Sequence, residues 1–68
     1  MEKVKISTEF IKLDQFLKFT GVCDTGADAK DFILEGKVSV NNSIEKQRGK
    51  KLRIGDIIET QGKSFMIY

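Results

Sequence analysis

Hydrophobic and polar positions alternate with two different periods along the chain, and the first third has the period of a helix. Leu13, Phe16, Leu17 and Thr20 recur at the spacing of one helical face, with polar residues between them. Gly21 follows where a left-handed C-terminal cap is expected. Four earlier hydrophobic residues predict a short extended lead into this helix: Val4, Ile6, Phe10 and Ile11.

A second helix is predicted from its ends as well as its hydrophobic face. Thr25 and Asp28 have the spacing of a capping box, in which hydroxyl and carboxylate each satisfy a backbone N–H, and Gly36 ends the pattern. Asp28 and Asp31 lie near the positive end of this helix, so we interpret them as helix-stabilising acids rather than a catalytic carboxylate pair. The predicted buried face consists of Ala29, Phe32 and Ile33.

After Gly36 the hydrophobic period changes to two, which predicts strands. Val38 and Val40 alternate with polar residues, and Asn41-Asn42 tolerates the positive φ angles of a tight turn before a segment returns from Ile44. Further on, Leu52 and Ile54 alternate with basic residues. Turns and strands then follow to the C-terminus: turn 55–56, strand 57–60, turn 61–63 and strand 64–68. The predicted class is α+β, with two short helices packed on a small antiparallel sheet.

Length and composition narrow the possible classes of protein. A chain of 68 residues, 40% hydrophobic and 32% charged, predicts a single folded domain spanning residues 1–68. No apolar run approaches the roughly 20 residues of a membrane span, and no segment resembles a signal peptide, so we expect a complete cytoplasmic protein that contacts no membrane.

The residue types exclude most catalytic and metal chemistry. The chain has no His and one Cys, which disfavours zinc binding and His-based acid–base catalysis, and we expect no cofactor. Cys23 is predicted to be a buried or half-buried thiol without a role, because its neighbour Asp24 would not activate it.

The net charge of +2 conceals a basic block. Residues 37–53 carry six basic side chains and one acid, giving +5, while the rest carries six basic side chains and nine acids, giving −3. From charge alone, an ordinary solvated loop and an anion-binding surface remain equally open. The basic residues of the block are Lys37, Lys46, Arg48, Lys50, Lys51 and Arg53.

Four ordered segments carry a family resemblance. They match, in order, the pattern R-L-D-x-x-L, a Gly, the pattern S-R-x-x-A-x-x-x-I-x-x-G-x-V-x-V-N-G, and G-D-x-I. The segments are Lys12–Leu17, Gly21, Ala29–Asn41 and Gly55–Glu59. They resemble the RNA-binding domain named for ribosomal protein S-four, also called the alpha-L motif. Thr25-Gly26, the stretch Arg48–Leu52 and the short length are most similar to its stand-alone YaaA-like members.

The resemblance implies a non-catalytic bacterial protein that binds structured RNA, ribosomal or transfer, and works in ribosome association or assembly. The ribosomal subunit is a further candidate partner, and no small-molecule substrate is implied. RNA helices are read mainly by shape and backbone contact, which suits exposed cations. The candidate RNA-binding residues are Lys12, Lys30, Lys37, Lys46, Arg48, Lys50, Lys51 and Arg53.

Several positions depart from the family pattern. Gly26 stands where many members have an RNA-contacting Arg, and Leu34 and Ser39 replace residues that are often basic. Asn42 replaces the turn Gly, at small conformational cost. These departures imply a weaker helix-borne part of the RNA face, with contacts shifted toward Lys12, Lys30, Lys37 and the basic loop within residues 37–53.

Other readings remain open from the sequence. The basic block would also suit a protein-interaction module, and the domain would also suit an appendage of a pseudouridine synthase or tRNA synthetase. A sulfur carrier is disfavoured because the chain ends Phe65–Tyr68, without a Gly-Gly tail. Among the aromatic residues outside the core faces, Phe19 is the one most expected to be exposed, while Phe10, Phe65 and Tyr68 are expected to pack on the core or its edge.

Overall fold

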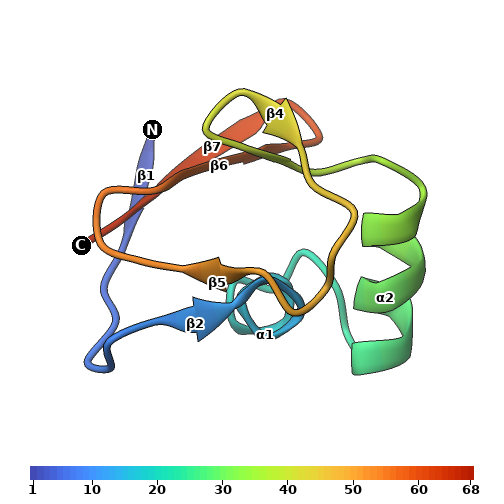
Figure 1. Cartoon of the computed structure of the whole chain (residues 1–68), viewed down its shortest axis with the longest axis horizontal. Helices are drawn as coiled ribbons and strands as arrows, with labels where there is room; N and C mark the ends of the chain where they lie inside the picture. Colours follow the sequence, from blue (N-terminus) through green and yellow to red (C-terminus); the bar gives the residue numbers. More distant parts are fainter.

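Nine short elements make up the chain in a computed structural model that describes all of residues 1–68. The elements are β1 (Glu2–Val4), β2 (Ile11–Lys12), α1 (Leu13–Phe19), α2 (Gly26–Leu34), β3 (Ser39–Val40), β4 (Ser43–Ile44), β5 (Lys51–Leu52), β6 (Ile57–Thr60) and β7 (Lys63–Ile67). Two helices lie between the N-terminal and C-terminal strands in sequence, and Figure 1 shows α1 next to β2 and β5 and α2 at the end away from the chain termini.

The ends of both helices lie where local chemistry predicts them. Gly21 and Gly36 have φ of +80° and +76°, the left-handed conformation that ends a helix. The Thr25 hydroxyl accepts a hydrogen bond of 3.1 Å from the backbone N–H of Asp28, which is the N-terminal half of the predicted capping box. The Asp28 carboxylate makes no return bond to Thr25, so the box is only half formed.

The larger sheet has five strands in the order β1-β7-β6-β3-β4. Antiparallel pairing is confirmed for β3–β4, β3–β6 and β6–β7, whereas β1 lies parallel to β7, with Glu2 opposite Phe65. Asn41 and Asn42 form the predicted tight turn, with φ of 51° and 69°. The Asn41 side chain also accepts a 3.0 Å bond from the backbone N–H of Ile57 and donates a 3.1 Å bond to Asp56, which ties this turn to the start of β6.

A separate two-stranded ribbon forms where β2 pairs antiparallel with β5. In Figure 1 this β2–β5 ribbon faces the five-stranded sheet from the other side of the molecule and runs directly into α1. It brings together two segments that lie about forty residues apart in sequence. The sequence pattern indicates both extended segments but not their pairing.

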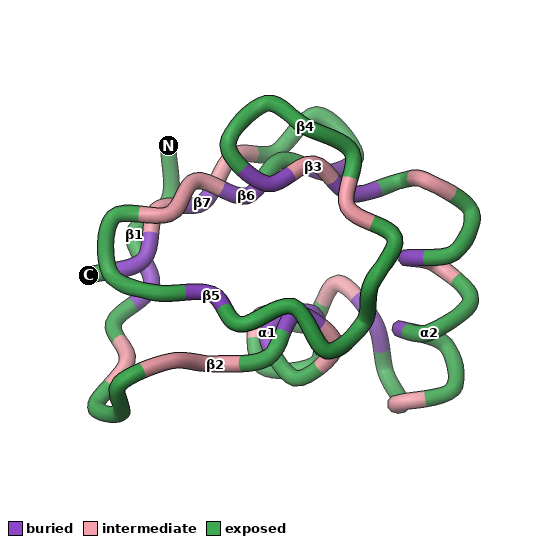
Figure 2. The backbone as a smooth tube through the Cα atoms, in the orientation of Figure 1, coloured by how far each residue is buried: buried purple, intermediate pink, exposed green.

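The hydrophobic core fills the space between the larger sheet, the ribbon and the helices. Figure 2 shows that the buried residues lie mainly on the strands and helices, while most of the connecting segments are exposed. Phe16 of α1 meets Phe65 of β7 edge to face, with ring centroids 5.5 Å apart. Because the helices and the strands share one core, the predicted α+β fold class is confirmed. The core also takes Leu13 and Leu17 from α1, Ala29 and Ile33 from α2, and Leu52 from β5, all fully buried.

Ile54 departs from the simple alternation. Leu52 is fully buried, whereas Ile54 is 68% exposed, because the strand ends at Leu52 and a turn begins at Arg53. The backbone N–H of Asp56 donates to the Arg53 carbonyl at 3.0 Å, and the Arg53 N–H donates to the Asp56 carboxylate at 2.8 Å. This turn points Ile54 outward.

The longer helix, α2, has nine residues, and neither helix combines the length and apolarity needed to cross a bilayer.

Candidate nucleic-acid interface

The outer face of the β2–β5 ribbon carries cations. The register places Ile11 opposite Leu52 and Lys12 opposite Lys51. Because successive side chains of a strand point to opposite faces, the buried Leu52 fixes which face is inner, and Lys12 and Lys51 share the outer one. Both lysines are exposed. Two residues predicted separately as RNA contacts are therefore direct neighbours across a ladder.

Lys12 occupies a position that is electrostatically unfavourable in the free protein. Like charges directly opposite each other in an antiparallel pair are destabilising, since their Cβ atoms lie about 4.5–5.5 Å apart. Lys12 is also the N-cap of α1 and makes no capping hydrogen bond, and a cation is unfavourable at the positive end of a helix. A bound anion would relieve both effects.

The basic loop between β4 and β5 is held by backbone hydrogen bonds to the start of α1. The Leu13 N–H donates to the Lys50 carbonyl at 2.9 Å, and the Asp14 N–H donates to the Arg48 carbonyl at 3.0 Å. These bonds use N–H groups that a helix start leaves without helical partners. Arg48 and Lys50 thus project exposed side chains from a fixed backbone. Five exposed cations meet in this region, and we call them the ribbon group: Lys12, Arg48, Lys50, Lys51 and Arg53.

Phe10 lies immediately before the ribbon and contacts two of these cations. The Lys51 ammonium lies 4.8 Å from the ring centroid, and the Arg53 guanidinium carbon lies 5.7 Å from it. Phe10 is half-buried, in agreement with the predicted edge packing. Its contacts with the basic residues were missed by sequence reasoning, because they depend on the pairing of β2 with β5.

Two further candidate residues lie at the C-terminal end of α2. A Cβ on Gly36 would lie 3.5 Å from the Lys46 side chain, so the aliphatic part of Lys46 passes over the end of the helix. The Lys37 ammonium lies 3.0 Å from the Glu35 carboxylate and 5.4 Å from the centroid of the Phe32 ring. Glu35 partly neutralises Lys37, which weakens it as an anion contact.

Lys30 stands apart from the other candidates. It is an exposed residue in the middle of α2, with the carboxylates of Asp28 and Asp31 nearby in sequence. No hydrogen bond, ion pair or cation–π contact joins it to the ribbon group. The eight predicted residues thus divide into the five of the ribbon group, two at the end of α2, and Lys30 alone.

The comparison that decides the family is a match of the S4 domain model to residues 4–68. This chain belongs to the S4 domain family. It is 44% identical over 59 residues to a probable ribosome maturation protein, RlbA of Bacillus subtilis (strain 168), and the match covers 87% of this chain and 83% of that protein. The predicted family resemblance is confirmed.

A solved structure shares the fold. YbcJ from E. coli, whose solution structure reveals an alpha-L motif involved in RNA binding, aligns with a TM-score of 0.73 and 28% sequence identity. The alignment covers 98% of this chain and 86% of YbcJ. The arrangement of two helices and a largely antiparallel sheet is therefore an alpha-L arrangement.

The departures from the family pattern have clear positions in this S4 domain. Gly26 is the first residue of α2, and nothing lies within 4 Å of the place where its Cβ would be. Leu34 is exposed near the other end of the same helix, while Ser39 is half-buried in β3. The surface of α2 consequently offers few cations, in contrast with the ribbon.

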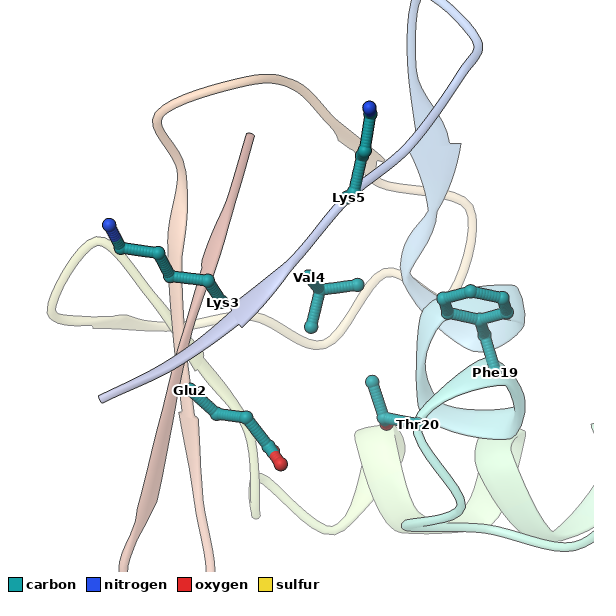
Figure 3. A pocket seen from close by; sticks show the side chains of 6 residues that line it. All are labelled: Glu2, Lys3, Val4, Lys5, Phe19 and Thr20. Atoms are coloured by element: carbon teal, nitrogen blue, oxygen red, sulfur yellow. The ribbon is translucent and has the colours of Figure 1, made fainter.

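A separate hollow of about 370 Å³ lies between β1 and the end of α1. In Figure 3 the Phe19 ring and Thr20 border it on one side and the β1 strand on the other, with Lys3 and Lys5 extending away from the ring. Phe19 is 66% exposed, which confirms the predicted exposure. One carboxylate, that of Glu2, also lines the hollow, so its charge is mixed.

The single thiol of this S4 domain is buried, as predicted. Burial is the main cause that raises the pKa of Cys23 above its ordinary value, and the nearby carboxylates of Asp28 and Asp24 raise it further. The thiol is therefore protonated at neutral pH. A protonated, buried sulfur is a poor nucleophile, so Cys23 fits a core role.

The charge conflict at Lys12 makes a prediction about the free protein. Replacing Lys12 with Met should stabilise the fold by about 0.3–1 kcal/mol at low salt, because it removes repulsion from Lys51 and from the helix end. The melting temperature should rise by about 1–8 °C. Lys12→Arg keeps the charge and is the matched control, for which we expect no gain. Thermal melting at low salt and at 1 M salt checks this, since screening should shrink the gain. An unchanged or lowered Tm for Lys12→Met would show that the lysines do not conflict.

Proposed function

We propose that this S4 domain binds structured RNA through the ribbon group, catalyses no reaction, and acts in ribosome maturation. The observation that carries the proposal is the concentration of unpaired cations on one surface, formed by the ribbon and the loop bonded to α1. The structure contains one salt bridge, Lys37–Glu35, so no residue of the ribbon group is neutralised by a carboxylate. These cations remain available for phosphate groups.

The geometry suits folded RNA more than a small ligand. The ribbon group spreads over a strand pair and an anchored loop, and none of its members lines a hollow in the surface. A-form RNA presents closely spaced phosphates that proteins contact largely by shape. Arg48 and Arg53 can bind phosphate oxygens with two parallel hydrogen bonds, while the lysines act as mobile point charges.

The relatives support ribosomal RNA rather than transfer RNA as the partner. RlbA is named as a probable ribosome maturation protein and YbcJ carries a motif involved in RNA binding. We therefore propose an assembling ribosomal subunit in the cytoplasm as the place of action. The ribbon group gathers amino and guanidinium groups without a thiol or carboxylate partner, an arrangement for holding anions rather than transferring protons.

Salt dependence tests the proposal. We expect the log of the affinity for folded Bacillus subtilis ribosomal RNA to fall with the log of the salt concentration with a slope of about −3 to −5, at roughly 0.7–0.9 per phosphate contact. Fluorescence titrations of the labelled protein between 50 mM and 500 mM salt would measure it. A flat response over this range would remove the electrostatic interface from consideration.

Competition separates RNA binding from recognition of an acidic protein surface. Unlabelled folded RNA should displace the labelled RNA, whereas polyglutamate at the same concentration of charges should displace little of it. Polyglutamate competing as well as RNA would instead favour the protein-interaction module.

A further inference from the structure

Phe10 lies against cations at the outer face of the ribbon. It directly precedes β2, and Arg53 directly follows β5, so alternation within the strands places only Lys12 and Lys51 on that face. Two distances place the ring beside the cations: the Lys51 ammonium lies 4.8 Å from the Phe10 ring centroid, and the Arg53 guanidinium carbon lies 5.7 Å from it.

The ring counteracts a tendency of these side chains to diverge. Lys12 and Lys51 stand directly opposite each other, so their ammonium groups repel and would separate in solvent. The negative face of an aromatic ring attracts a cation at this distance. Long basic side chains also lose rotamer freedom when they bind, and a contact that restricts them beforehand lowers this loss.

We propose that Phe10 is a positioning residue of the RNA interface, whose ring holds Lys51 and Arg53 beside Lys12 in the arrangement that receives phosphate. The inference rests on the proposed function. Phe10 acts through the two cations and need not touch RNA itself. The half-buried position of its ring supports this, because burial fixes the ring while leaving a face to the cations.

The first test compares rings with an aliphatic side chain. Phe10→Leu keeps the apolar body and removes the aromatic face, and we expect it to weaken the binding of folded ribosomal RNA by about three- to tenfold. Phe10→Tyr keeps the aromatic face and should bind within about twofold of the parent. Phe19→Leu is the control, because Phe19 is exposed but has no cation over its ring, and it should also stay within about twofold.

The second test asks whether Phe10 acts through the cations. In a Lys51→Met, Arg53→Met background, Phe10→Leu should cause no further loss of RNA affinity, since the groups it positions are gone. A further loss of threefold or more in that background would mean that the ring contacts RNA directly, and the positioning role would be wrong. Thermal melting of each variant confirms that the comparison is made between folded proteins.

The outcomes separate this inference from the proposed function. If Phe10→Leu binds like the parent while a double substitution of Arg48 and Lys51 binds weakly, the interface stands and the role of Phe10 is refuted. If neither protein differs from the parent, the ribbon group is not the interface and both proposals fail.

Discussion

Replacing Arg48 and Lys51 together with Ala should weaken the binding of folded ribosomal RNA by about 2–4 kcal/mol, or roughly 30- to 1,000-fold. Hydrogen bonds to charged groups contribute roughly 1.5–3 kcal/mol each, and the lower total allows for solvent screening at exposed side chains. The fold should be little affected, because exposed substitutions usually change stability by no more than about 0.5 kcal/mol. Titration of the double variant and its thermal melting measure the two effects.

The control for this prediction removes the same charge elsewhere. Lys3 in β1 and Lys63 in β7 are exposed and belong to the larger sheet. Their double Ala variant should lose less than about threefold in affinity, through the change in net charge alone. An equal loss in both double variants would mean that RNA responds to total charge and not to the ribbon surface.

Lys12 belongs to the ribbon group, whereas Lys30 lies apart from it on α2. Replacing both with Ala should cost less RNA affinity, measured by the same titration, than replacing Arg48 and Lys51. Because Lys12 lies opposite Lys51, Lys12 should account for most of that smaller loss.

Replacing Leu52 with Ala should destabilise the fold by about 2–5 kcal/mol. Leu52 is fully buried and is the side chain by which β5 anchors the ribbon in the core. A domain of this size has a total free energy of unfolding of only about 3–10 kcal/mol, so the Tm should fall by at least about 10 °C. Urea unfolding and thermal melting both measure this.

Ile54 is the matched control, since it lies two positions along the same segment and is exposed. Ile54→Ala should change the free energy of unfolding by less than about 0.5 kcal/mol. A large destabilisation by Ile54→Ala, or a small one by Leu52→Ala, would contradict the described end of β5 at Leu52.

Local features of the fold were predictable because a few neighbouring residues determine them. The glycines that end the helices and the Asn41-Asn42 turn need only their own backbone preferences, and the structure has positive φ at each of them. The Thr25 cap likewise depends on residues three positions apart.

Pairing between distant strands was not predictable in the same way. The parallel partner of β1 and the union of β2 with β5 depend on tertiary packing, and each strand involved is too short to carry a distinctive pattern. Ile54 departs from the alternation for a related reason, since bonds between Arg53 and Asp56 turn the chain out of the strand.

The candidate site was also predictable only in part: the sequence indicates its residues, but the pairing of distant strands decides which of them lie together. The basic block and the family resemblance together indicated the eight candidate residues, yet only the strand register brings Lys12 next to Lys51. Lys30 lies on α2, outside the ribbon. The role we assign to Phe10 depends on the distances of two cations from its ring, which the spacing of residues does not give.

The most direct test of the account is to map the RNA footprint on the protein by NMR. Uniformly ¹⁵N-labelled protein would be titrated with a folded ribosomal RNA fragment that it binds. We expect the largest amide shift changes at residues 10–14 and 46–53, which comprise the ribbon, the start of α1 and the basic loop. Changes confined to α2, or to the hollow beside Phe19, with residues 46–53 unaffected, would contradict the proposal that the ribbon group is the RNA interface.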